Sequence, residues 1–149
     1  MTSIVPIAKR TIAKLAIAAA IVSLIGIVDA TYLTIHHYPA EAVPCGAEFD
    51  CEMVLTSKWA DIGGIPLSIF GLLAYLFAFT LAAISISGKR LTWNIYGIQA
   101  TIMAIVSVYL IYVQHYYIHA WCQYCLISAA TSFTLFLVFL ISLFFRPRR

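Results

Sequence analysis

The residues best suited to chemistry in this sequence are its four cysteines, which fall into two close pairs. Cys45 and Cys51 have five residues between them, and Cys122 and Cys125 form a Cys-x-x-Cys motif. A thiolate attacks a disulfide through a mixed disulfide, so two neighbouring pairs can pass electrons from one to the other. Thiol and disulfide exchange is therefore the first chemistry that the sequence indicates.

The Cys-x-x-Cys motif stands where a short segment, 115–121, meets a long apolar run. On the first turn of a helix, Cys122 and Cys125 share a face, so their sulfurs can act together. The helix N-terminus favours a thiolate by about 0.3–1 kcal/mol, which is less than the roughly 1.36 kcal/mol that one pKa unit requires. We therefore expect that a neighbour such as His119 or a bound acceptor assists, or that the attack is slow without substrate.

The first pair lies in a different setting. Pro44 and Gly46 flank Cys45, and this composition is typical of a turn or a flexible loop. A mobile loop can carry a sulfur between two partners, so the loop pair is suited to exchange with both the second pair and an outside protein.

The elements that must position these cysteines are membrane helices. Of 149 residues, 63% are hydrophobic and 10% are charged, whereas soluble proteins average about 25% charged. A helix needs about 20 apolar residues to cross a hydrocarbon core. Four runs meet this requirement: 15–33, 66–87, 93–116 and 122–145. The sequence predicts an all-α membrane protein, a four-transmembrane-helix bundle with a long extracytoplasmic loop between helices 1 and 2.

The first apolar run follows basic residues, as in a signal peptide, but it is longer than a typical signal core. No Ala-x-Ala site follows it before the acidic loop, so we expect it to be retained as the first span. The four spans account for most of the chain. We therefore expect a single domain, 1–149, without a fused thioredoxin-like domain, and membrane lipid as its surroundings.

Basic residues indicate the orientation, because cytoplasmic loops carry the excess of lysine and arginine. They gather near span ends that four crossings place on one face: Lys9, Arg10, Lys14, Lys89, Arg90, Arg146, Arg148 and Arg149. This face is predicted to be cytoplasmic and to hold both termini, with only Lys58 on the other side. All four cysteines then lie on the extracytoplasmic face, where disulfides persist.

The outer loop, about 36–65, is acidic: it carries Glu41, Glu48, Asp50, Glu52 and Asp61. These carboxylates form either a solvated loop or a docking surface for a basic patch on a partner. The basic residues elsewhere are explained by topology, and no run resembles a nucleotide-binding loop. Nucleic-acid binding is therefore not expected.

Two alternatives assign the cysteines a structural role. Short disulfide rings of this size contribute roughly 2 kcal/mol each, a small gain for a bundle that the membrane already constrains, so a non-catalytic scaffold with two disulfides is the weaker reading. Zinc sites with four cysteines usually pair two short knuckles, whereas Cys45 and Cys51 are more widely spaced. We expect no metal site.

The order of the motifs resembles the vitamin K epoxide reductase (VKOR) family, in particular its bacterial and archaeal disulfide-forming members. The likeness covers most of the chain. It consists of Cys45, Cys51-Glu-Met-Val-Leu-Thr-Ser57, Gly64-Ile-Pro-Leu-Ser-Ile-Phe-Gly71 and Cys122-Gln-Tyr-Cys125. In the other bacterial four-helix disulfide oxidase the Cys-x-x-Cys lies in the first outer loop, whereas here it lies in the second outer segment.

The resemblance implies a relay of thiol exchanges that ends on a quinone. Cys45 would exchange with a thioredoxin-fold thiol protein acting in trans, and Cys51 would exchange with Cys122. Cys125 would lie nearest the quinone and donate two electrons to it. The implied location is a prokaryotic cell membrane, and the implied result is oxidation of the partner in support of disulfide bond formation.

The resemblance also indicates where the quinone ring would lie. Ser68, Phe70 and Gly71 begin the second span at the depth of the Cys-x-x-Cys motif. Phe70 could flank a quinone ring, with ordinary packing as the alternative, and Gly71 would allow close approach of another helix. Animal members hydrogen-bond the naphthoquinone ring through polar residues at two positions that here hold Leu67 and Ala129. A ubiquinone or menaquinone acceptor is therefore favoured over the alternative, a naphthoquinone or epoxide reductase of the vitamin K cycle type.

Two more residues are candidates for a functional role. Asp29 is an ionisable group within the first span, and such groups are commonly functional, although near the span end it could instead cap an outer segment. Ser57 resembles a family position that anchors the outer loop, and its alternative is an ordinary helix-capping serine.

Overall fold

Long apolar helices build the protein, because in lipid a helix satisfies all its own backbone hydrogen bonds. The computed structural model describes residues 4–39 and 42–145. Its elements are α1 (Ile4–His37), α2 (Cys51–Leu55), β1 (Asp61–Ile62), β2 (Ile65–Pro66), α3 (Leu67–Ser85), α4 (Arg90–Val113), the π-helical turn η1 (Gln114–Ile118) and α5 (Gln123–Phe144).

Four of the described helices are long and apolar enough to cross a membrane, as predicted: α1, α3, α4 with η1, and α5. Large apolar side chains on their outer faces are exposed, for example Val28 at 68% and Leu91 at 73%. Such surfaces suit lipid, since lipid tails are as apolar as the side chains themselves. The predicted four-helix membrane fold is confirmed.

The helix bounds differ from the predicted spans mainly at α1. This helix covers residues 4–37 rather than 15–33, because it continues past the apolar run at both ends. Hydropathy locates the part of a helix that lies in hydrocarbon, whereas the backbone hydrogen bonds continue into the polar boundary on either side.

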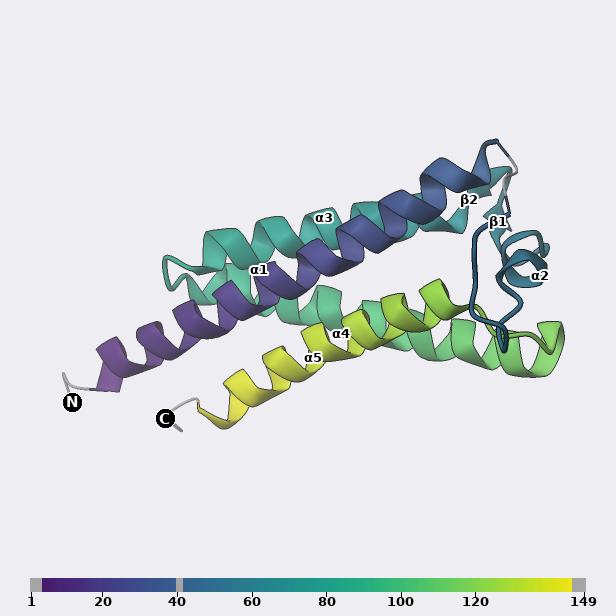
Figure 1. Cartoon of the computed structure of the whole chain (residues 1–149). Helices are drawn as coiled ribbons and strands as arrows, with labels where there is room; N and C mark the ends of the chain where they lie inside the picture. Colours follow the sequence, from purple (N-terminus) through teal and green to yellow (C-terminus); the bar gives the residue numbers. More distant parts are fainter. Residues whose placement is uncertain (1–3, 40–41, 146–149) are drawn as a thin grey trace.

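The helices pack as an antiparallel bundle in which α1 contacts α3 and α5, and α4 contacts α5 and α3. The start of α1 and the end of α5 lie at one end of the bundle, and the loop with α2, β1 and β2 covers the other end, beside the α4 to α5 connection (Figure 1). Polar side chains join the helices inside: Trp93 Nε1 donates to Ser142 Oγ at 2.8 Å, and Tyr96 donates to the Leu135 carbonyl at 3.0 Å.

Apart from Asp29, the charged residues of the described part separate between the two ends of the bundle. Gly88, in the turn between α3 and α4, lies beside the side chain of Lys9, so the basic residues of α1 and of this turn share one end. The acidic residues of the loop and Lys58 lie at the other. Arg146, Arg148, Arg149 and Glu41, which belong to the same prediction, lie outside the described residues.

The loop between α1 and α3 has local order that fits its sequence. Asp50 caps the short helix α2, because its side chain accepts from the Met53 N–H at 3.0 Å. β1 and β2 then pair as a short β-hairpin with a two-residue turn, which was not predicted. Gly63 and Gly64 both have positive φ, which two-residue hairpin turns require and glycine permits.

Close helix contacts occur at glycines other than the one predicted, Gly26 and Gly97, where an added Cβ would overlap an aromatic ring of a neighbouring helix. A Cβ at Gly71 would lie 4.0 Å from the Ala30 Cβ, an ordinary contact, whereas a Cβ at Gly26 would overlap the ring of Tyr75. The prediction that Gly71 permits close approach is therefore wrong. Gly26 has this role, because the buried Tyr75 side chain lies directly against the backbone of α1.

Gly26→Ala is expected to lower stability by about 1–3 kcal/mol, the usual cost of overpacking a tight contact. Gly71→Ala is the matched control, and it should be neutral or slightly stabilising because alanine favours a helix over glycine by about 1 kcal/mol. Thermal unfolding of both variants in the same detergent measures the difference. Equal melting temperatures would contradict the assignment of Gly26 as the close contact.

Candidate redox site

The two cysteine pairs stand in different redox states. Cys45 and Cys51 are joined by a disulfide, whereas Cys122 and Cys125 are free thiols. Cys51 and Cys122 are fully buried, at 1% and 0% exposure, and Cys125 is half-buried.

Cys51 and Cys122 belong to one buried cluster, together with Val54 and Ala120. Cys45 and Cys125 pack against the same cluster. The fold therefore brings together two pairs that the chain separates by about half its length. The loop pair packs at the mouth of the bundle, where the last span begins.

The two residues inside the Cys-x-x-Cys motif fasten the loop on both sides of Cys45. Gln123 Oε1 accepts from the Gly46 N–H at 3.2 Å, and the Tyr124 hydroxyl donates to the Pro44 carbonyl at 2.9 Å. Each hydrogen bond of this kind contributes about 0.5–1.5 kcal/mol net. These contacts are weak enough for the loop to be released and strong enough to favour the docked position.

A distorted turn sets the start of the motif. α4 continues as the π-helical turn η1, and its buried Gln114 accepts from the Cys122 N–H at 3.0 Å through Oε1. His119 ends this turn with φ 55°, in the left-handed region. π-Helical turns are frequent at functional sites, and here the turn redirects the chain so that Cys122 caps α5.

The sulfur of Cys122 is positioned to be the more acidic thiol. It accepts from the Cys125 N–H at 3.3 Å. A hydrogen bond from the Cys125 side chain, supported by the backbone N–H groups of Cys125 and Tyr124, lowers the pKa of Cys122 below its ordinary value, although burial opposes the shift. The exposed His119 is not among the groups that lower this pKa.

Cys125→Ala is expected to move the titration of Cys122 to higher pH, because it removes the largest cause of the lowered pKa and keeps the backbone N–H groups. A thiolate forms as pH rises through its pKa, so at neutral pH less of Cys122 would be reactive. The pH dependence of Cys122 alkylation by a small reagent measures this shift. His119→Ala is the comparison and should leave the pH midpoint of Cys122 alkylation unchanged. A shifted midpoint in His119→Ala with none in Cys125→Ala would show that His119, and not Cys125, lowers the pKa of Cys122.

A cavity of about 580 Å³ opens below the two pairs, between the helices. Its volume is within the range of about 300–1,000 Å³ that small-molecule sites occupy. The predicted quinone-contact residues all line it: Leu67, Ser68, Phe70, Gly71 and Ala129. Cys125 lines it as well, whereas Cys122, Cys45 and Cys51 do not. The site thus places one sulfur of the inner pair at the wall of an apolar cavity.

Hydroxyl groups mark one wall of this cavity. The Tyr75 hydroxyl donates to the Ser128 carbonyl at 2.6 Å and lies 2.9 Å from both Ser128 Oγ and Ser132 Oγ. These residues flank Ala129 on α5. A phenol therefore lies beside the position where animal members carry a tyrosine, but it comes from α3 and its hydrogen bonds are already occupied.

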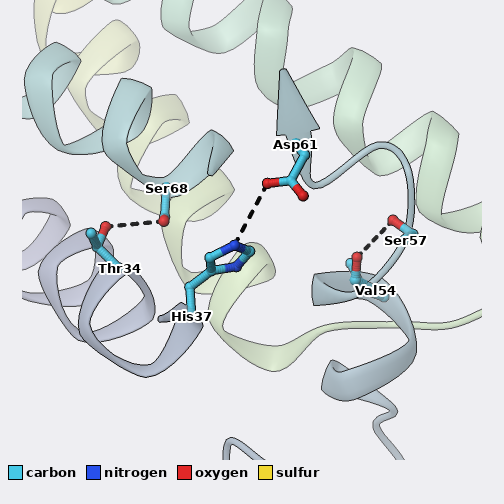
Figure 2. Close-up of polar contacts among 6 residues, drawn as sticks. All are labelled: Thr34, His37, Val54, Ser57, Asp61 and Ser68. Atoms are coloured by element: carbon cyan, nitrogen blue, oxygen red, sulfur yellow. Dashed lines mark hydrogen bonds and ion pairs between the residues drawn. The ribbon is translucent and has the colours of Figure 1, made fainter. Parts of the chain in front are cut away.

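Figure 2 shows three polar contacts whose residues, apart from Thr34, line the cavity. His37, at the end of α1, lies 3.6 Å from the Asp61 carboxylate on β1. The Thr34 hydroxyl donates to Ser68 Oγ at 3.0 Å and links α1 to α3. Ser57 donates to the Val54 carbonyl at 2.7 Å, so its hydroxyl closes the end of α2.

Asp29 also lines the cavity, and it lies inside α1 rather than at its end. The helix continues to His37, so Asp29 does not cap an outer segment. Its side chain is buried, with 8% exposure.

Sequence reasoning missed four residues that shape this site: Gln114, Gln123, Tyr124 and Tyr75. Gln114 and Tyr75 are polar groups within apolar runs, a signal that often marks function. Gln123 and Tyr124 carry no such signal, because their role depends on where the loop docks. Within 4–39 and 42–145, no three His, Cys, Asp or Glu residues are grouped to hold a metal ion.

A sequence model of the vitamin K epoxide reductase family matches residues 17–140, a stretch that contains all four cysteines and every described residue of the cavity wall. The match covers most of the chain and agrees with the four membrane helices. The chain is thus an integral membrane oxidoreductase, and it belongs to the vitamin K epoxide reductase family.

Proposed function

We propose that this protein oxidises a thioredoxin-fold partner and reduces a membrane quinone, passing two electrons through Cys45 and Cys51 and then through Cys122 and Cys125. The observation that carries the proposal is the shared buried cluster of Cys51 and Cys122, with Cys125 at the cavity wall. Cys51 thus packs in one cluster with Cys122, to which it would pass electrons, and Cys125 borders the space proposed for the quinone.

The first two steps exchange one disulfide for another. A partner thiolate attacks Cys45, and the second partner thiol displaces it, so the partner disulfide forms and the loop disulfide breaks. Cys51 then attacks Cys122 of the inner disulfide and releases Cys125. Cys45 attacks Cys51, which restores the loop disulfide and frees Cys122. Thiolate character and access control each rate.

The last step consumes the quinone. Cys122 and Cys125 form a disulfide and give up two electrons and two protons, and the quinone takes both electrons and one proton on each oxygen to become a quinol.

A plain ubiquinone or menaquinone is the favoured acceptor. Leu67 and Ala129 supply no hydrogen bond at the two positions where animal members hold the ring, and the nearby Tyr75 hydroxyl is engaged with Ser128 and Ser132. Reduction of a vitamin K epoxide would need a donor at the epoxide oxygen. The cavity wall near Cys125 thus suits a quinone better.

The proposed orientation places the loop and all four cysteines on the extracytoplasmic face of a prokaryotic membrane, with both termini in the cytoplasm. The separation of basic and acidic ends in the described part of the chain supports it. The disulfide partner would then be a separate protein on the oxidising side.

The experiment starts from protein in which the loop pair is oxidised and the inner pair is reduced. Short-chain ubiquinone, short-chain menaquinone or vitamin K epoxide is added separately, followed by a reduced soluble thioredoxin-fold protein. Alkylated cysteines are counted by mass after each addition. A quinone should remove both labels, and the reduced partner should restore them.

If neither pair ever changes state, the cysteines are structural and the non-catalytic scaffold is the correct reading. If the epoxide oxidises the inner pair as fast as the quinones, the acceptor assignment is wrong. Loss of labels in a Cys125→Ala variant as complete as in the unmodified protein would overturn the terminal-donor role of Cys125.

A further inference from the structure

Asp29 is a carboxyl group buried within a membrane helix. Its neighbour Val28 is 68% exposed, whereas Asp29 is 8% exposed, so the carboxyl group faces the bundle and not the lipid. Ionisable residues inside membrane spans are costly, and their presence usually marks a pathway for protons, ions or substrate.

Nothing in the described part of the chain explains Asp29 structurally. Its Oδ2 is buried and has no hydrogen-bond partner there, and it is the one buried side-chain oxygen or nitrogen of which this is true. An unpaired polar group in an apolar interior costs roughly 1–3 kcal/mol. A carboxyl group kept at this cost is suited to exchange a proton with a ligand.

The carboxyl group lies on the same cavity as the reacting sulfur. Asp29, Cys125 and Tyr75 all line it. A ring bound in the cavity would therefore have the dithiol and Asp29 as neighbours.

We propose that Asp29 transfers a proton from the cysteine dithiol to the quinone oxygen that faces α1. This role rests on the proposed function and names the group that protonates the quinone. Oxidation of the dithiol releases two protons as the S–S bond forms, and the quinol needs two. Asp29 takes one of them and gives one to the quinone oxygen, so its own protonation is unchanged after each turnover.

Other titratable groups on the cavity wall are less suited to this step. His37 and Asp61 lie 3.6 Å from each other. The His36 ring is hydrogen-bonded to the Tyr32 carbonyl at 2.9 Å. Glu52 is exposed, and the Tyr75 hydroxyl is held by Ser128 and Ser132. Asp29 combines burial, an oxygen without a hydrogen-bond partner in the described part of the chain, and a place on the same cavity as Cys125.

The test separates proton transfer from binding and from thiol exchange. Asp29→Asn, Asp29→Glu and the control Glu48→Gln, an exposed loop carboxylate away from the cavity, are compared in three measurements. These are oxidation of the pre-reduced inner pair by short-chain ubiquinone in a single turnover, ubiquinone affinity, and exchange between the two cysteine pairs without quinone.

Asp29→Asn should slow the quinone step about 10²-fold, within the usual range for a general acid, and leave affinity and pair exchange within about threefold. Asp29→Glu should recover most of the rate, because a carboxyl group in a cavity of about 580 Å³ can reach the ring from a longer side chain. Glu48→Gln should match the unmodified protein in all three.

Three results would overturn the inference: an unchanged quinone step in Asp29→Asn, a loss in Asp29→Glu equal to that in Asp29→Asn, or a parallel loss of affinity and rate, which would indicate a structural role. If Asp29→Asn fails to fold, judged by its helical signal and melting, the Asp29→Glu variant decides. Failure of the unmodified protein to oxidise its inner pair with any quinone would refute the proposed function itself.

Discussion

A chain with Cys45→Ala and Cys125→Ala is expected to join its two remaining cysteines, Cys51 and Cys122, in most molecules after mild oxidation. These residues are fully buried in one cluster, and a disulfide requires Cα atoms within about 7 Å and converging side chains. The bond would be the trapped form of the step that connects the two pairs. Peptide mapping without reduction detects it.

The matched control keeps Cys51 with the other inner cysteine. In a Cys45→Ala, Cys122→Ala chain the remaining pair is Cys51 and Cys125, and Cys125 lines the cavity. This variant should form the corresponding bond in a small minority of molecules. Equal yields in the two variants, or none in either, would contradict direct exchange between Cys51 and Cys122.

The same reasoning predicts the effect of single changes on turnover. Partner-driven quinone reduction should fall to background when any one of the four cysteines becomes alanine, because each exchange needs the sulfur before and after it. Residual turnover in one variant would identify a cysteine that the route bypasses.

Ala129→Trp is expected to slow quinone reduction about 10- to 100-fold while pair exchange continues. Ala129 lines the cavity one turn beyond Cys125, so an indole there would occupy the space proposed for the ring. Moving a large apolar side chain out of the way costs about 1.5–3 kcal/mol, and each 1.4 kcal/mol is a factor of ten. Quinone titration of the single-turnover rate measures the loss.

Ile127→Trp is the control for this change. Ile127 is on the same helix and is 39% exposed, and it is not part of the cavity wall. The same side chain placed there should leave quinone reduction within about twofold of the unmodified protein, since exposed substitutions usually cost little. Similar losses in both variants would mean that a tryptophan harms α5 in general and that the cavity is not the quinone site.

The sequence was sufficient to predict the membrane fold. Each apolar run must become a helix in lipid, because no other single segment satisfies its backbone there, so length and composition locate α3 and α5 within a few residues. The grouping of the four cysteines into two close pairs was likewise visible in the sequence. Asp50, whose residue type commonly caps helices, precedes the short helix α2.

The sequence could not indicate which helix faces meet. These helices are apolar nearly all round, so no stripe of polar residues marks an outer face. Gly71 was therefore assigned the close contact that the structure gives to Gly26, and Asp29 was left between the interface and the interior. The inward position of Asp29 follows from the packing of α1 on α3 and α5.

The sequence by itself determined the four crossings and the two cysteine pairs, because both depend on properties of short segments. The tertiary structure alone decided that Gln123 and Tyr124 hold the loop around Cys45 and that Cys125 and Asp29 share a cavity. These contacts join residues far apart in the chain, and their formation depends on how four similar apolar surfaces fit together.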